Sequence, residues 1–452
     1  MPFPLFSRLV QLALSICFTT QFYSAVAQPG AIPDSILPQM RYAAKEGLLD
    51  HSYPRNIDTQ YGGYLSTFSY NWQPVGAQDK MIVTQARHIW STAKATAFYK
   101  DERYLPMAKH GYLFLRDRMW DQENGGFHNL VSRDGKVKSD MKEAYGHAFG
   151  IYGLAAYYAV SKDTGALGLA KRAFYWLEQH THDAKAKGYF QNLRQDGKPA
   201  VRNAQTPSTS TLGYKDQNSS IHLLEAFTEL YHVWPDPLVK TRVQEMLDLL
   251  LDKIIQPKGY LQLFLTPEWK PVTFRDKGRE GILQHRNVDH VSFGHDVETA
   301  YLMMEASEAV GNYRHADVLR KGKEMVDHSL RIGWDKALGG FYDQGYYFPG
   351  DTAITIIKDS KNWWAQAEGL NTLLICSRLY PDDPLDYAGK FVQLWQYAQT
   401  YLIDHQYGDW YEEGLDKEPE RRTGNKAHIW KATYHNFRSL SNCIKILEAR
   451  KG

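Results

Sequence analysis

Cysteine is scarce in this chain, which has three in 452 residues: Cys17, Cys376 and Cys443. Cys376 and Cys443 lie in apolar stretches with helical spacing, so we expect buried thiols rather than a disulfide bridge. A small disulfide-stabilised scaffold is therefore excluded. Hydrophobic residues make up 43% of the chain and charged residues 23%, which is the composition of a globular protein stabilised by a hydrophobic core.

An excess of one charge is also missing. The formal net charge is +2, and no stripe of Lys and Arg accompanies it, which argues against a nucleic-acid-binding surface. No linker rich in Pro, Gly or Ser divides the chain. We therefore expect a single catalytic domain over residues 28–452, with no nucleic acid as its partner.

Several motifs of common enzyme classes are absent. The sequence has no G-x-G-x-x-G, no phosphate-binding loop, and no strand that would support either. It has no H-E-x-x-H, and His295-x-x-Glu298 lacks the adjacent histidine of the inverted zinc motif. The G-x-S-x-G motif of serine hydrolases is missing as well. We therefore expect neither a nucleotide cofactor nor a metal.

The N-terminal apolar run, residues 9–18, is too short to cross a membrane and is interrupted by Gln11. Arg8 precedes this run, and the Ala-Val-Ala at 25–27 matches the small-x-small pattern of a signal-peptide cleavage site. We predict that residues 1–27 are a secretory signal peptide cleaved near Ala27. The mature protein is then periplasmic or secreted, without stable membrane insertion.

What the chain does contain is a repeat. Its spacing of roughly 60 to 80 residues is the length of two helices and a connection. An aspartate stands five residues before the glycine in four of the units, at Asp58, Asp121, Asp183 and Asp335. The sequence therefore predicts six copies of one two-helix unit. Each copy is marked by a glycine followed by a bulky residue: Gly63-Tyr64, Gly126-Phe127, Gly188-Tyr189, Gly259-Tyr260, Gly340-Phe341 and Gly408-Asp409-Trp410.

Apolar residues recur at helical spacing in pairs of segments. The joints within a pair are short, whereas the return connections hold the glycine turn and a long polar loop, such as 193–217 or 266–293. Long loops without helices of their own are usually functional. The pattern predicts an all-α (α/α)6 barrel with one plain end and one mouth that carries the long loops. Its twelve helices are expected near 35–50, 82–99, 102–118, 144–161, 165–181, 218–233, 236–255, 294–311, 314–330, 363–379, 384–403 and 434–449.

The helices that follow the long loops open with polar residues that are not typical of a buried helix. We expect these residues to converge on one pocket at the mouth. A histidine at a helix N-terminus is disfavoured as imidazolium, and neutral imidazole is the form that a general base needs. Glu298 lies one helical turn after His295 and can orient a neighbour or a substrate hydroxyl. The six positions recur about 60 to 75 residues apart: Arg87, His147, His222, His295, Gln366 and His435.

Three segments resemble a known family: residues 292–298 (SFGHDVE), 363–368 (WWAQAE) and 430–436 (WKATYHN). Asn218, the segment 222–226 (HLLEA) and the segment 145–149 (YGHAF) support them. On these motifs the sequence resembles the N-acylglucosamine 2-epimerase superfamily, and within it the cellobiose 2-epimerases. The resemblance covers nearly the whole chain after residue 27.

The resemblance implies a cofactor-independent epimerisation at C2 of a reducing sugar through a cis-enediolate, with His295 and His435 as the acid/base pair. Because C2 must be inverted, we expect these two histidines to reach the sugar from opposite sides of the barrel. By the same analogy Arg87 stabilises the enediolate oxygens, and His222 assists ring opening or holds O1. The expected substrate-binding residues are Tyr145, Asn218, Glu298, Trp363, Trp364, Glu368 and Trp430.

The leading substrate is cellobiose or a related β-1,4-linked disaccharide. Ser220 and His147 differ from residues common in cellobiose 2-epimerases, so a mannose 2-epimerase or an aldose-ketose isomerase of the same superfamily is the alternative. A glycoside hydrolase, a lyase or a carbohydrate-binding protein with this barrel is a more remote alternative. A hydrolase needs a carboxylate pair, for which Glu298 and Glu368 are candidates. The sequence does not predict the oligomeric state.

Overall fold

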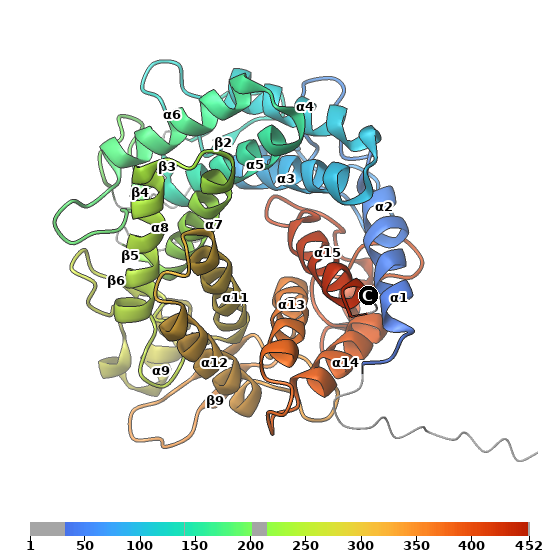
Figure 1. Ribbon diagram of the computed structural model, residues 1–452, viewed down its shortest axis with the longest axis vertical. Coiled ribbons are helices and arrows are strands. Elements are labelled where there is room, and N and C mark those ends of the chain that lie inside the picture. Colours follow the sequence, from blue (N-terminus) through green and yellow to red (C-terminus); the bar gives the residue numbers. More distant parts are fainter. Residues whose placement is uncertain (1–31, 140, 201–214, 451–452) are drawn as a thin grey trace, which may run out of the picture.

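The computed structural model describes residues 32–139, 141–200 and 215–450, and these form the predicted (α/α)6 barrel (Figure 1). Its inner helices make a closed ring, in which each contacts the next and the last contacts the first. The bounds agree with the predicted helices to within a few residues. The inner ring consists of α3 (Ile82–Tyr99), α5 (Ala144–Ser161), α7 (Gln217–Val233), α11 (Phe293–Ala309), α13 (Trp363–Leu379) and α15 (Tyr434–Glu448).

The outer helices surround this ring, and α1 packs against α15 to complete it. In four of them the α-helix passes into a five-residue π-helical turn: η1 (Lys45–Leu49) after α1, η3 (Leu115–Met119), η4 (Leu250–Ile254) and η6 (Ala398–Leu402). The π turns were not predicted, because they continue the apolar pattern of the helix before them. The outer helices are α1 (Ile36–Ala44), continued by α2 (Asp50–Ser52), α4 (Leu105–Phe114), α6 (Thr164–His180), α8 (Pro237–Leu249), α12 (His315–Ile332) and α14 (Tyr387–Tyr397).

Short joints connect five of the six inner helices to the following outer helix at the plain end, as predicted, and α15 is the last described helix. Several of these joints end in an aspartate that is the N-cap of the outer segment. Its side chain accepts hydrogen bonds from the free backbone N–H groups of the first turn. Asp163 accepts from the amides of Gly165 and Ala166, and Asp236 accepts from that of Leu238. Asp101 caps the 3-10 turn η2 (Glu102–Tyr104) that leads into α4.

The mouth holds short antiparallel sheets in which the residues before one inner helix pair with the loop of the next repeat. These pairings connect neighbouring repeats. The loop 266–293, predicted without helices of its own, contains η5 (Arg275–Lys277), α9 (Gly278–Gln284) and α10 (Arg286–Asp289), and η7 (Pro419–Thr423) lies in the last loop. The pairs are β1 (Lys80–Met81) with β2 (Leu130–Val131), β3 (Lys142–Glu143) with β4 (Asn192–Leu193), β5 (Lys215–Asp216) with β6 (Phe264–Leu265), and β7 (Val291–Ser292) with β8 (Gln344–Tyr346) and β9 (Thr355–Lys358).

The glycine turns lie at the mouth end of each outer helix and require glycine for two reasons. Gly126 has φ +74°, a conformation that residues with a side chain rarely adopt. A Cβ atom there would also lie 2.7 Å from His147 Nε2 and 2.8 Å from the Trp176 ring. The turn therefore approaches the next inner helix too closely for any side chain.

Ion pairs, four of them buried and one partly buried, connect five of the six turns to the segment that leads into an inner helix. Lys142 Nζ lies 2.8 Å from Asp121 Oδ2 and also donates to the Gly125 carbonyl. The fourth turn has Gln256 and Val291 at the corresponding positions, so both charges are absent together. The pairs are Asp58–Lys80, Asp121–Lys142, Asp183–Lys215, Asp335–Lys361 and Asp404–Lys426.

Two other predictions concern the thiols and the N-terminus. Cys376 and Cys443 are buried free thiols, as expected. The predicted signal peptide and its cleavage site at Ala27 lie outside the described residues. None of the helices within residues 32–450 that the structure describes is both long and apolar enough to span a membrane.

Candidate active site

Ten of the eleven predicted site residues line one cavity of about 170 Å³ at the mouth of the barrel. The exception is Glu368, which is fully buried beneath the cavity. Drug-sized ligands occupy pockets of roughly 300–1,000 Å³, so this cavity suits about one sugar ring. The lining residues are Arg87, Tyr145, Asn218, His222, His295, Glu298, Trp363, Trp364, Trp430 and His435.

The start of each inner helix determines which side chains reach the cavity. Tyr145, Asn218, Trp364 and His435 are second residues of their helices, and His295 is a third residue. A deeper layer comes from the sixth residue, one turn further along: Arg87 in α3, His222 in α7, Glu298 in α11 and Glu368 in α13. Trp430 lies in the loop before α15.

His147 and Gln366 do not line the cavity, so the expectation that all six recurring positions converge there is wrong. Both are fourth residues of their helices, and they bind the backbone of the glycine turns instead. His147 Nε2 lies 2.8 Å from the Phe127 nitrogen, and Gln366 Oε1 lies 2.8 Å from the Phe341 nitrogen. Ser220 occupies the same register in α7 and donates to the Asp216 carbonyl. The differences at Ser220 and His147 therefore lie outside the cavity.

His295 and His435 are not on opposite walls, contrary to the expectation. They come from α11 and α15, which are separated in the ring by α13. Trp364 of α13 lies between them. The centroid of its ring is 4.6 Å from that of the His295 ring and 5.9 Å from that of the His435 ring. The order of the ring places Arg87 across from His295 and His222 across from His435. The two histidines thus flank one tryptophan within the cavity.

Each of the three cavity histidines is held at Nδ1. His222 Nδ1 lies 2.8 Å from Glu225 Oε2, and His435 Nδ1 lies 2.6 Å from Glu368 Oε1. Since a carboxylate only accepts, both Nδ1 atoms donate, which leaves Nε2 as the free basic nitrogen. His295 Nδ1 lies 2.8 Å from the Ser292 hydroxyl.

Burial keeps these histidines neutral. It lowers the pKa of His295 to about 3, with smaller contributions from the neighbouring histidines. Burial, together with the nearby Arg87 and Arg438 charges, lowers the pKa of His435 well below its ordinary value. Burial also lowers the pKa of His222, although Glu225 opposes the shift. All three imidazoles are therefore unprotonated at neutral pH and able to accept a proton.

Arg438, which the sequence analysis missed, lies beneath the cavity at the centre of three carboxylates. Its guanidinium bonds Glu225, and its Nη2 lies 2.5 Å from Glu298 Oε1 and 2.6 Å from Glu368 Oε1. Although burial opposes ionisation, Arg438 and His222 lower the pKa of Glu225 to about 2. Burial and the neighbouring Glu368 raise the pKa of Glu298, and burial raises that of Glu368. These shifts favour the protonated form of Glu298, while Glu368 accepts from both His435 and Arg438.

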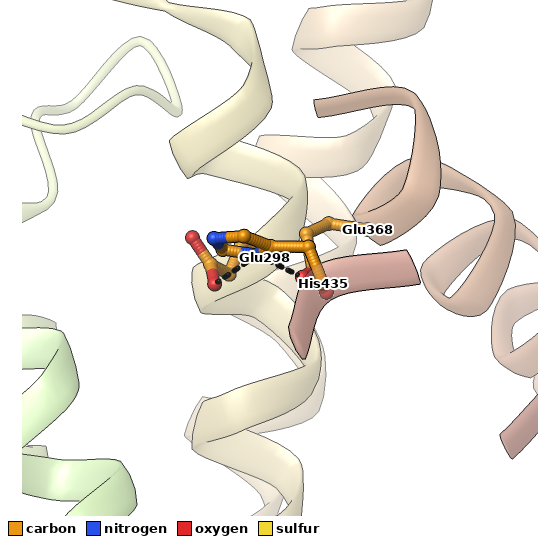
Figure 2. A group of neighbouring side chains, drawn as sticks. All are labelled: Glu298, Glu368 and His435. Carbon is orange, nitrogen blue, oxygen red and sulfur yellow. Dashed lines mark hydrogen bonds and ion pairs between the residues drawn. The ribbon is translucent and has the colours of Figure 1, made fainter. Parts of the chain in front are cut away.

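Figure 2 shows Glu298, Glu368 and His435 gathered at this point, with the contacts from His435 to both carboxylates dashed. Their ligand atoms lie within 4.8 Å of one another, a spacing compatible with a metal ion. The Arg438 guanidinium already bridges the same two oxygen atoms. A divalent cation would have to compete with this charge.

Arg87 brings a positive charge to the cavity. Its Nη1 donates to the Trp430 carbonyl at 2.8 Å and its Nη2 to the Tyr145 hydroxyl at 3.1 Å. Its guanidinium lies over the Phe149 and Tyr434 rings. Among the described residues no carboxylate forms an ion pair with it, so its charge is available to an anion in the cavity.

Unsatisfied polar atoms give the cavity a preference for hydroxyl groups. Trp363 Nε1, Asn218 Oδ1 and Arg87 Nε are buried and have no hydrogen-bond partner within the described part of the chain. Leaving such atoms unpaired is costly unless a ligand or water satisfies them. Two donors and one acceptor beside indole faces match a sugar, which has hydroxyls and apolar C–H faces.

The chain is similar to known proteins in sequence and in fold. The sequence pattern of the N-acylglucosamine 2-epimerase (GlcNAc 2-epimerase) family matches residues 63–439. The chain belongs to this family. It is 26% identical to the cellobiose 2-epimerase of Bacteroides fragilis over 420 residues, which cover 92% of this chain and 99% of that protein.

Two further proteins are similar to this chain. The D-mannose isomerase of Marinomonas mediterranea is 24% identical over 402 residues, covering 87% of this chain and 94% of that protein. The structure of cellobiose 2-epimerase from Bacillus thermoamylovorans superposes with a TM-score of 0.79 at 24% identity, covering 91% and 100% of the two chains. The two chains thus share the barrel fold.

Proposed function

We propose that this protein, an enzyme of the sugar epimerase and isomerase group, is a 2-epimerase of reducing sugars with cellobiose or a related β-1,4-linked disaccharide as its substrate. The observation that carries the proposal is the pair His295 and His435, two neutral imidazoles in one cavity with the unpaired cation Arg87. The similarity to cellobiose 2-epimerases over nearly their whole length supports the choice of sugar.

The reaction follows from the acidity of the C2 proton once the sugar ring is open. One histidine accepts this proton at Nε2, the C2–H electron pair forms the C1–C2 double bond, and O1 takes the negative charge. The other histidine, which first takes up one proton from solvent and is then an imidazolium, donates that proton to the opposite face of C2 while the C1 carbonyl re-forms. The two histidines exchange protonation states in each turnover, so the reverse reaction uses them in opposite roles.

Other groups prepare and stabilise this intermediate. The Arg87 guanidinium, fixed by Trp430 and Tyr145, stabilises the cis-enediolate oxygens. His222, with Nδ1 held by Glu225, moves the proton between O1 and the ring oxygen during ring opening. Trp363 Nε1 and Asn218 Oδ1 bind sugar hydroxyls.

The size of the cavity bears on the length of the substrate. A volume of about 170 Å³ holds the reducing-end sugar, and a second sugar would extend towards the open mouth. The similarity to a D-mannose isomerase supports one alternative reaction, in which the same enediolate is reprotonated at C1 to give a ketose. The two reactions share every step up to the intermediate.

A time course followed by NMR in D2O tests this proposal, with cellobiose, mannobiose, glucose and mannose offered separately. We expect the 2-epimer of the disaccharide, with deuterium at C2 of both epimers, and a loss of at least about 100-fold in H295A and H435A. Ketose as the main product would establish the isomerase, and a product without deuterium at C2 would exclude the enediolate. Hydrolysis to monosaccharides would identify a glycosidase.

The proposal places the enzyme outside the cytoplasm, on the basis of the Ala-Val-Ala at 25–27 and the apolar run before it. Fractionation of expressing cells followed by N-terminal sequencing is the test. A mature N-terminus at Gln28 in the periplasm or medium is expected. An intact N-terminus in the cytoplasmic fraction would contradict it.

A further inference from the structure

Arg438 joins groups from four inner helices. It lies one turn after His435 in α15 and contacts Glu225 of α7, Glu298 of α11 and Glu368 of α13. Its side chain is 3% exposed, and it does not line the mouth cavity. It therefore has no direct access to a sugar bound there.

Two of these carboxylates are the ones that hold the histidines. Glu225 Oε2 accepts from His222 Nδ1 while Glu225 Oε1 bonds Arg438, and Glu368 Oε1 accepts from both His435 Nδ1 and Arg438 Nη2. The chain of contacts runs from one guanidinium through one carboxylate to each imidazole. A single planar cation with five donors can make these bonds at once, whereas an ammonium cannot match its geometry.

We infer that Arg438 is the positioning residue that fixes the Nδ1–H tautomer and the orientation of both His222 and His435. The inference rests on the proposed function and adds to it a residue that touches no substrate. Without the guanidinium, three buried carboxylates would face one another and take up protons. A protonated carboxyl can donate instead of accept, and the imidazoles would then lose their single orientation.

A second cavity reaches Arg438 from the other end of the barrel. It lines a cavity of about 310 Å³ at the plain end, together with Trp90, Asn442 and Lys445. Trp90 Nε1 and Arg438 Nε are buried there without a hydrogen-bond partner among the described residues. If the side chain is removed, a free guanidinium ion can enter from the plain end, without passing through the sugar site.

The charges on the helices packed around Arg438 decide which ion binds in the space that is left when its side chain is removed. The three contacted carboxylates outnumber the single guanidinium, so a small cation is favoured in its place. The titratable groups that face it are Tyr152 of α5, His222, Glu225 and Glu229 of α7, Glu298, Tyr301 and Glu305 of α11, Glu368 of α13, Tyr434, His435 and Lys445 of α15, and Lys94 of α3.

Chemical rescue of R438A tests the inference. We expect kcat to fall about 100-fold or more in R438A, as for a misplaced catalytic group, and at least 10-fold in R438K. Guanidinium ion should restore kcat in R438A without raising the KM for the sugar. K445A, in the same cavity and helix, should keep wild-type activity and show no response. Wild-type kcat in R438A, or rescue that competes with the sugar, would overturn the inference.

A second measurement needs no substrate and so separates the inference from the proposed function. The side-chain 15N shifts of His222 and His435 should report one Nδ1–H tautomer in the wild type and a mixture in R438A and R438K. Unchanged shifts in the folded variants would overturn the inference even if the enzyme is an epimerase. Altered shifts in a protein that epimerises no sugar would support it and refute the proposed function alone.

Discussion

His147 Nε2 accepts a hydrogen bond from the backbone nitrogen of Phe127 at 2.8 Å, while Nδ1 donates to the Glu143 carbonyl at 2.7 Å. This histidine therefore secures the second glycine turn to the start of α5. Burial lowers its pKa to about 3, so it stays neutral. Gln85 and Gln366 bond the first and fifth turns in the same way, each through both amide atoms.

From this equivalence we predict that H147Q keeps wild-type kcat and nearly wild-type stability. H147A should lose about 1–3 kcal/mol of unfolding free energy, because the Phe127 amide is left buried and unsatisfied. Denaturant unfolding and a kcat measurement are the tests. A drop in kcat for H147Q like that of H435A would place His147 in the reaction after all.

The Asp121–Lys142 pair should contribute to stability only as a pair. We expect K142M to lose about 3–5 kcal/mol, because Asp121 is then a buried charge without its partner. The double variant D121N/K142M should lose less, as in the fourth turn, where Gln256 and Val291 stand without charges. A double-mutant cycle measures the coupling, with K198A on an exposed pair as the control. Additive losses would show that the pair is not coupled.

The same pairs predict acid lability. Although burial opposes ionisation, Arg133 and Lys80 lower the pKa of Asp58 to about 2. A lowered pKa stabilises the fold above the ordinary Asp value of about 3.9, and this contribution is lost as the pH falls towards 2. We expect unfolding free energy to drop between about pH 4 and pH 2, and to drop less steeply in D58N. Equal slopes in both proteins would refute the role of Asp58.

Glu225 and Glu298 should respond differently to the loss of a charge. Glu225 is an anion at neutral pH, whereas burial and Glu368 favour the protonated form of Glu298. We predict that E225Q loses about 100-fold in kcat at pH 7, because the amide has one acceptor oxygen and cannot accept from both His222 and Arg438. E298Q should lose less than about 10-fold, since an amide resembles a neutral carboxyl. Similar losses in both variants would show that Glu298 works as an anion.

The sequence predicts the helices well, because six repeats of an apolar pattern define them independently. It predicts the cavity for the same reason, since each mouth loop leads into the first turn of an inner helix. It failed at the register within those turns: His147 and Gln366 share the spacing of the cavity residues but lie at the fourth helical position, whereas the recurring polar residues of the cavity lie at the second, third or sixth. A shift of two residues turns a helical side chain by about half a circle.

Arg438 and the lysine partners were missed for different reasons. The lysines follow their aspartates by 21 to 32 residues, a separation that varies with the mouth loop. Their common position, two residues before an inner helix in four of the five cases, is a signal that the sequence does contain. For Arg438 the signal is a cation one turn after His435 in an otherwise buried helix.

The short plain-end joints have a consequence for the chain as a whole. Because short strands and single β-bridges at the mouth connect neighbouring repeats, and α1 packs on α15 with Arg41 Nη2 2.7 Å from Glu448 Oε1, the ring is held together without its plain-end loops. The first and last described helices are neighbours, so a short linker could join them while a new opening is made at another joint. Because the ring of helices closes on itself, its packing does not require the chain to open at one particular joint, and we expect circular permutants opened at other plain-end joints to fold to the same barrel.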